Sequence, residues 1–145
     1  MAFVWSILLT TAVMMLCTLL HYEVVSRLDR FARVIEWPTH AVLVGVLAAL
    51  TLTHVVEIGI YAASYGLADM IRIGGLRGSA ALSTAEYFIF AAETYSSLGS
   101  ADVVPQGEIR LMASLSPLNG ILMLAWSASF LFSLVERWRA PRAER

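Results

Sequence analysis

The stretch ETYSSLGSADVVP, residues 93–105, lies between two strongly apolar segments of a 145-residue chain. It is rich in small and polar residues, holds a single glycine, and carries two carboxylates, Glu93 and Asp102. Irregular backbone at membrane depth is tolerated only where it is buried in protein or lines a water-filled cavity. If the apolar segments on either side cross a membrane, the stretch therefore predicts a loop enclosed by protein or facing water.

The composition indicates a membrane protein. Hydrophobic residues make up 59% and charged residues 14% of the chain, and the mean hydropathy is +0.73, which is outside the usual range of soluble domains. The net charge is -1 and every basic residue is an arginine, with no basic stripe that would bind nucleic acid. Cys17 lies in an apolar run and is expected to be a buried, unpaired thiol. The sequence contains no nucleophile–base pair and no metal motif, so we expect no enzyme, no cofactor and no resident metal.

Three segments are long and apolar enough to cross a bilayer, which takes about 20 residues. They are residues 2–20, a run from about Pro38 to Gly66, and the uncharged run between Arg110 and Glu136. A cleaved signal peptide is the alternative for the first, but no positive region precedes it and no small-residue cleavage site follows it.

Arginine sets the expected orientation. The connector 21–37 and the C-terminal tail hold seven of the ten arginines: Arg27, Arg30, Arg33, Arg137, Arg139, Arg142 and Arg145. The positive-inside rule therefore predicts a multi-pass protein of the cell membrane with the N-terminus outside and the C-terminus in the cytoplasm. The connector has apolar residues on one face, which predicts an amphipathic helix whose arginines meet anionic headgroups of the inner leaflet. A short soluble turn is the alternative.

A shorter apolar segment follows the second span. The sequence STAE at 83–86 is a capping-box pattern, which predicts the start of a helix. About ten to fourteen helix-compatible residues follow it, a length that suits a re-entrant segment better than a span. Residues 71–81 read as a Gly-rich extracellular connector. A short helix and an irregular loop between two spans predict a pore loop.

The order of span, short helix, T-x-x-S-L-G-S-A-D and span resembles the pore module of the tetrameric potassium channel family, whose filter is written T-x-x-T-V-G-Y-G-D. The run after the loop also looks like the second pore helix of small bacterial ion-channel-domain proteins. The resemblance covers residues 38–138 and implies an all-α membrane protein of three transmembrane helices, a re-entrant pore helix and a filter loop, assembled as a homotetramer. Residues 1–37 are then an N-terminal span with a cytoplasmic connector, and residues 139–145 a short tail.

The resemblance implies passive conduction of monovalent cations through backbone carbonyls. The implied filter residues are Ser97, Leu98, Gly99, Ser100 and Ala101, supported by Glu93, Thr94 and Asp102. Two positions depart from the family pattern, since Ser100 replaces a tyrosine and Ala101 replaces a glycine that takes positive φ. We therefore expect relaxed selectivity, with Na⁺ passing as well as K⁺. The alternative is a collapsed filter in a non-conducting partner or modulatory subunit.

Four further groups of residues stand out, and three of them have candidate supporting roles. Glu93 and Asp102 resemble the carboxylate pair that shares a proton behind the filter in some family members; the alternative is that both are solvated at the outer mouth. The intramembrane pair His54 and Glu57 is spaced i, i+3, so both side chains share a helix face. Three interpretations stay open for this pair: a hydrogen-bonded contact with the pore helix, a pH-sensitive element or a metal pair. The remaining groups are the inner-helix residues Pro117 and Gly120, which predict a hinge or a close packing contact, and the histidines His21 and His40, expected to have no special role.

Overall fold

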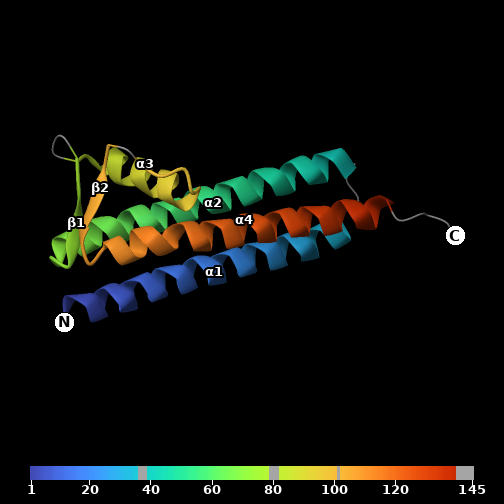
Figure 1. Cartoon of the computed structure of the whole chain (residues 1–145). Helices are drawn as coiled ribbons and strands as arrows, with labels where there is room; N and C mark the ends of the chain where they lie inside the picture. Colours follow the sequence, from blue (N-terminus) through green and yellow to red (C-terminus); the bar gives the residue numbers. More distant parts are fainter. Residues whose placement is uncertain (36–38, 79–81, 101, 140–145) are drawn as a thin grey trace, which may run out of the picture.

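The computed structural model describes residues 1–35, 39–78, 82–100 and 102–139. Its three long helices, α1 (Ala2–Val34), α2 (Thr39–Met70) and α4 (Arg110–Arg139), run side by side, and a short helix, α3 (Thr84–Tyr95), lies against one end of the bundle (Figure 1). Each long helix is apolar and long enough to cross a membrane. The predicted helical membrane protein with three spans is confirmed.

The first helix is longer than the sequence analysis expected. We predicted a span that ends near residue 20 and a separate amphipathic helix after it, whereas α1 continues as one helix to Val34. The stretch contains no glycine or proline, so nothing in it interrupts the helical hydrogen bonds. The helix ends where Ile35 turns to extended backbone. At this end of the bundle Arg137 of α4 lies 2.7 Å from Asp29, which ties α1 to α4.

Two four-residue strands join the segments on either side of α3. Strand β1 (Gly74–Arg77) pairs antiparallel with β2 (Val104–Gly107). The pairing needs glycine at its end, because Gly107 has a φ of +70° and a Cβ there would come 3.0 Å from the Cα of Gly74. The sequence analysis read residues 71–81 as a connector and did not predict a strand. Because β1 and β2 are paired, the segment between them, which contains α3, begins and ends at the same end of the bundle.

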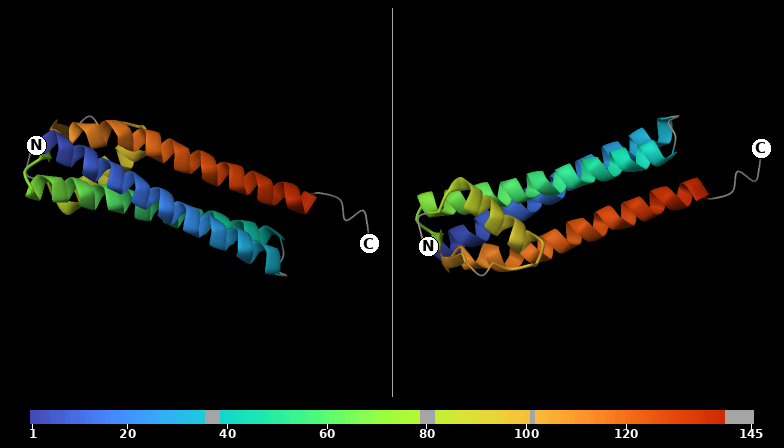
Figure 2. Two further views of the ribbon diagram at one scale, coloured as in Figure 1. Left: turned by 90° about the horizontal axis from the view of Figure 1, so that it is seen from below. Right: turned by 90° about the horizontal axis from the view of Figure 1, so that it is seen from above.

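The arrangement of the ends fits the topology expected from the spans. The N-terminus, α3 and the strand pair lie at one end of the bundle, and the C-terminal end of α4 lies at the other, near the end of α1 and the start of α2 (Figures 1 and 2). One cluster of buried side chains fills the bundle around Tyr61, Tyr65, Phe90 and Tyr95. This cluster packs α3 against α2.

Candidate functional site

Helix α3 enters the bundle from the end that carries the strands. Ser83 and Glu86 form the predicted capping box, in which each side chain accepts from the other residue's backbone N–H. Near the start of the helix the Tyr87 hydroxyl donates to Asp69 of α2 at 3.1 Å, and at its last residue the Tyr95 hydroxyl donates to Glu57 of α2 at 2.5 Å.

Helix α3 rises about 12 Å between Tyr87 and Tyr95, and the two residues that it contacts, Asp69 and Glu57, lie roughly 18 Å apart along α2. Both distances are about half of a hydrocarbon core of about 30 Å. The chain then turns, and Val104 begins the strand that pairs with β1 back at the end of the bundle. The segment thus enters and leaves on one side, which confirms the predicted re-entrant helix and loop.

The loop after α3 has a backbone of alternating handedness. Ser97 has a φ of +65° and Gly99 a φ of +79°, whereas Leu98 and Ser100 do not have positive φ. The backbone N–H of Ser97 donates to Thr94 and that of Gly99 to Glu93, which anchors the turn on the last residues of the helix. A positive φ is strained for a serine, so Ser97 is a strained position that the sequence did not predict. Alternating handedness turns successive peptide groups toward the same side, which is what a ring of carbonyl ligands requires.

The side chains of the loop are largely uncovered by this chain. Ser97, Leu98 and Gly99 are exposed, and Leu98 has 78% of its surface free. A Cβ at Gly99 would meet nothing within 4 Å, so the glycine is required by its φ and not by crowding. Ala101, the position that replaces the family's second glycine, lies outside the described residues. An apolar side chain as exposed as Leu98 indicates a surface that other protein or lipid covers.

The residues expected to support the filter are placed differently from one another. Thr94 is buried, and its hydroxyl donates to the Phe90 and Ala91 carbonyls of its own helix. Glu93 is half-buried and Asp102 is exposed. Among the described residues, neither carboxylate is hydrogen-bonded to the other. The shared proton between Glu93 and Asp102 stays a prediction.

Gly120 lies where α4 passes the end of α3. A Cβ at this position would overlap the backbone carbonyl of Tyr95, closer than any real carbon–oxygen contact. The absent side chain therefore lets α4 approach the start of the loop after α3, which favours the packing alternative. Pro117 lies inside α4 one turn earlier, and the helix continues through both residues from Arg110 to Arg139. The hinge at Pro117 and Gly120 stays a prediction.

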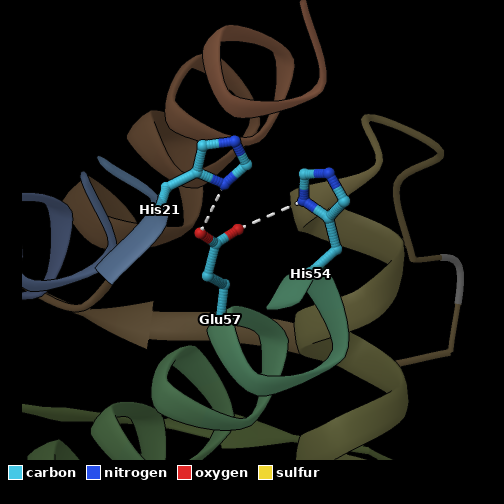
Figure 3. A group of neighbouring side chains, drawn as sticks. All are labelled: His21, His54 and Glu57. Atoms are coloured by element: carbon cyan, nitrogen blue, oxygen red, sulfur yellow. Dashed lines mark hydrogen bonds and ion pairs between the residues drawn. The ribbon is translucent and has the colours of Figure 1, made fainter. Parts of the chain in front are cut away.

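Below the loop, the intramembrane pair belongs to a larger polar network. Glu57 is fully buried between two imidazoles, with its Oε1 3.0 Å from His21 Nδ1 and its Oε2 3.2 Å from His54 Nδ1 (Figure 3). Tyr95 at the end of α3 donates to the same Oε2, and His54 Nδ1 lies 3.0 Å from the Tyr95 hydroxyl. The His54–Glu57 pair is therefore hydrogen-bonded to the end of α3. The pH-sensitive element and the metal pair stay predictions.

The network also corrects the expectation for His21. We predicted that His21 lies near the membrane boundary without a special role, but it is fully buried and bonded to Glu57. Its Nε2 lies 3.2 Å from the Ser127 hydroxyl of α4, and His54 Nε2 lies 3.1 Å from the same oxygen. Residues of all four helices therefore meet at this point.

One signal in the sequence would have found His21. The buried residues of α1 recur every three or four positions: Ser6, Thr10, Val13, Cys17, His21 and Val25. This stripe is the face of a single helix that packs on other helices, and His21 falls on it. With residues 21–37 predicted as a separate connector, His21 is not assigned to this face. Tyr95 and Ser127 carry no comparable signal, since their partners lie far away in the sequence.

Comparison with known proteins agrees with this geometry. A family model described as an ion channel matches residues 41–137, which hold α2, α3, the loop, the strands and most of α4. Helix α1 precedes the matched region. No curated protein and no solved structure matches the chain.

Proposed function

Because the chain belongs to the ion channel family, we propose that it is a homotetrameric cation channel of potassium-channel type. The observation that carries the proposal is the re-entrant α3, which ends midway along α2 and α4 and continues into a loop of alternating handedness. Backbone carbonyls from a ring of such loops replace the hydration shell of a permeating cation. The C-terminal end of α3 also carries a partial negative charge, which favours cations over anions.

Assembly of four copies is supported by the surfaces that one chain leaves uncovered. Leu98 in the loop is 78% exposed, and α4 also carries exposed large apolar side chains: Leu118, Ile121, Leu122, Leu124 and Phe132. A single loop cannot form a ring of ligands, so the proposal requires the loops to meet on a common axis with α4 beside the pore. Part of this apolar surface of α4 is then covered by neighbouring copies, and part lines the cavity.

Relaxed selectivity is the finer part of the proposal. Ser100 replaces the tyrosine whose ring packs behind the family's filter, and Ala101 replaces its second glycine. The loop has a left-handed residue at Ser97 and at Gly99, which supports carbonyl sites at its inner end. Fewer ordered carbonyl rings discriminate K⁺ from Na⁺ less strongly.

The proposed membrane orientation places the N-terminus and the strands outside and the end with Asp29 and Arg137 in the cytoplasm. Arginines concentrate at that second end, as the positive-inside rule requires. The proposed membrane is the cell membrane, where the arginines of the α1 end and of the tail meet anionic headgroups of the inner leaflet.

Ion flux into proteoliposomes tests the proposal. The purified chain is reconstituted, and uptake of K⁺ and of Na⁺ is measured against each gradient, with protein-free vesicles as the control. We expect uptake of both ions with a preference for K⁺. The double variant Ser100→Tyr with Ala101→Gly restores the family's filter and should raise the K⁺ over Na⁺ ratio.

A non-conducting partner or modulatory subunit is the second candidate. It is favoured by the same departures at Ser100 and Ala101, which remove the features that hold the outer filter open. The absence of flux for the wild type together with flux for the double variant would establish this candidate. The absence of flux for both, in protein that forms tetramers, would refute the channel proposal.

A further inference from the structure

Three side chains of the kind that ligate metals meet inside the bundle. His21 comes from α1, and His54 and Glu57 come from α2. Each offers one ligand atom, and these atoms all lie within 4.8 Å of one another. The carboxylate lies between the two rings, and both imidazoles turn an Nδ1 toward it (Figure 3). Two imidazoles and a carboxylate are a donor set that divalent transition ions accept.

The spacing of these donors suits a metal ion. Imidazole nitrogen and carboxylate oxygen bind Zn²⁺ at about 2.0–2.2 Å, so two ligands of one ion lie about 3.0–3.4 Å apart for octahedral to tetrahedral angles. The Nδ1 atoms of His21 and His54 lie 3.0 and 3.2 Å from the Glu57 oxygens. The most widely separated donors, within 4.8 Å of each other, must come up to about 1.4 Å closer before one ion is bound by all three.

The Nε2 atoms of the two histidines have the same partner. The Nε2 atoms of His21 and His54 lie 3.2 and 3.1 Å from the hydroxyl oxygen of Ser127. That hydroxyl has one hydrogen and two lone pairs. If Nδ1 of each ring binds a metal, both Nε2–H groups donate to Ser127, which accepts both. Donation of the free ring N–H to a fixed acceptor is the usual support for a metal-bound histidine.

Tyr95 supplies a fourth donor, an oxygen, next to the other three. Its hydroxyl lies 2.5 Å from Glu57 Oε2 and 3.0 Å from His54 Nδ1. A divalent ion held by one carboxylate leaves a net charge of +1 in a membrane interior, which is unfavourable. The Tyr95 hydroxyl oxygen, bound as the fourth ligand, completes the coordination of the ion, whose bonds to all four donors must offset this remaining charge.

We propose that His21, His54 and Glu57, closed by the Tyr95 oxygen, form an intramembrane binding site for a divalent transition ion of the Zn²⁺ type. The bound ion joins α1 and α2 to the end of α3, where the filter loop begins, and the Ser127 hydroxyl of α4 supports both histidines. The site thereby fixes the N-terminal helix, which lies outside the matched ion channel region, to the pore module. The proposal does not rest on conduction, because its test counts bound ions.

Metal content of the full chain purified in detergent tests the site. The protein is stripped with a chelator and dialysed against buffered Zn²⁺, and the bound metal is measured by mass spectrometry. The variants are His21→Gln, Glu57→Gln and Ser127→Ala, and the matched control is His40→Gln, which changes an exposed histidine of α2. We expect about one ion per chain for the wild type and the control. Ser127→Ala should weaken binding about 10–100-fold, as loss of a supporting hydrogen bond does, and the ligand variants should weaken it further.

A second measurement needs no variant. Co²⁺ is titrated into the stripped wild type, and the visible absorption of the ion reports its ligands: a strong band indicates four-coordinate binding, which Zn²⁺ should displace. If folded wild-type protein does not bind Zn²⁺ or Co²⁺ stoichiometrically, the proposal is overturned. Hydrogen bonds alone then join the residues of the network. Equal binding by the wild type, His21→Gln and Glu57→Gln also overturns it, because the ion would lie elsewhere.

Discussion

The substitution Gly120→Ala decides whether this glycine is a hinge or a packing contact. At a hinge in open space, alanine stabilises a helix by about 1 kcal/mol relative to glycine. In the structure, however, the new Cβ overlaps the Tyr95 carbonyl, which is backbone and cannot rotate away. Overpacking of this kind costs about 1–3 kcal/mol, and a clash with backbone belongs at the upper end of that range. We therefore expect a net loss of about 2 kcal/mol after the gain in helix propensity.

Thermal unfolding in detergent measures the sign of this effect. For a chain of this length, 1 kcal/mol corresponds to about 4 °C, so the apparent Tm of Gly120→Ala should fall by about 8 °C. Gly45→Ala is the matched control, because a Cβ at this glycine of α2 meets nothing within 4 Å. It should raise the apparent Tm by up to about 4 °C. A rise for Gly120→Ala comparable to that of Gly45→Ala would refute the packing contact.

Three other substitutions test individual contacts. Ser83→Ala removes the capping box with Glu86 and should lower the free energy of unfolding by about 1 kcal/mol, measured by chemical denaturation; no change would show that the cap contributes nothing. Tyr61→Phe leaves the buried amide of Asn119 without its 3.1 Å partner and should cost about 1–3 kcal/mol in the same assay, whereas a neutral result would mean that the amide finds another acceptor. Glu93→Gln should change the open-channel lifetime in single-channel recording if the carboxylate braces the filter, and unchanged lifetimes would remove it from the mechanism.

Much of the fold is readable from local features of the sequence. The spans follow from length and hydropathy, and the start of α3 follows from Ser83 and Glu86, because a capping box involves residues three positions apart. Local features of the sequence do not predict the short strands at 74–77 and 104–107. Each is only four residues long and becomes a strand by pairing with the other across α3 and the loop.

In the candidate site too, some residues can be predicted from local sequence and others cannot. The pair His54 and Glu57 is identifiable in the sequence because both are polar, lie in one span and share a helix face. The contacts of this pair with His21 and Ser127 are not, because those residues belong to other helices, and even the periodic stripe of α1 that holds His21 does not show which residue it meets. Which side chains meet there depends on how α1 and α4 are rotated and shifted against α2.

The sequence by itself determined a three-span membrane protein with a re-entrant helix and a glycine-containing loop, since each of these depends on residues close together in the chain. Only the tertiary structure decided that His21 reaches Glu57, that Ser127 bonds both histidines, and that Gly120 makes room for the Tyr95 carbonyl. Apolar surface is similar all round a membrane helix, so hydropathy does not specify its rotation. The rotation of each helix is determined by packing among the four helices and by hydrogen bonding of their few buried polar groups.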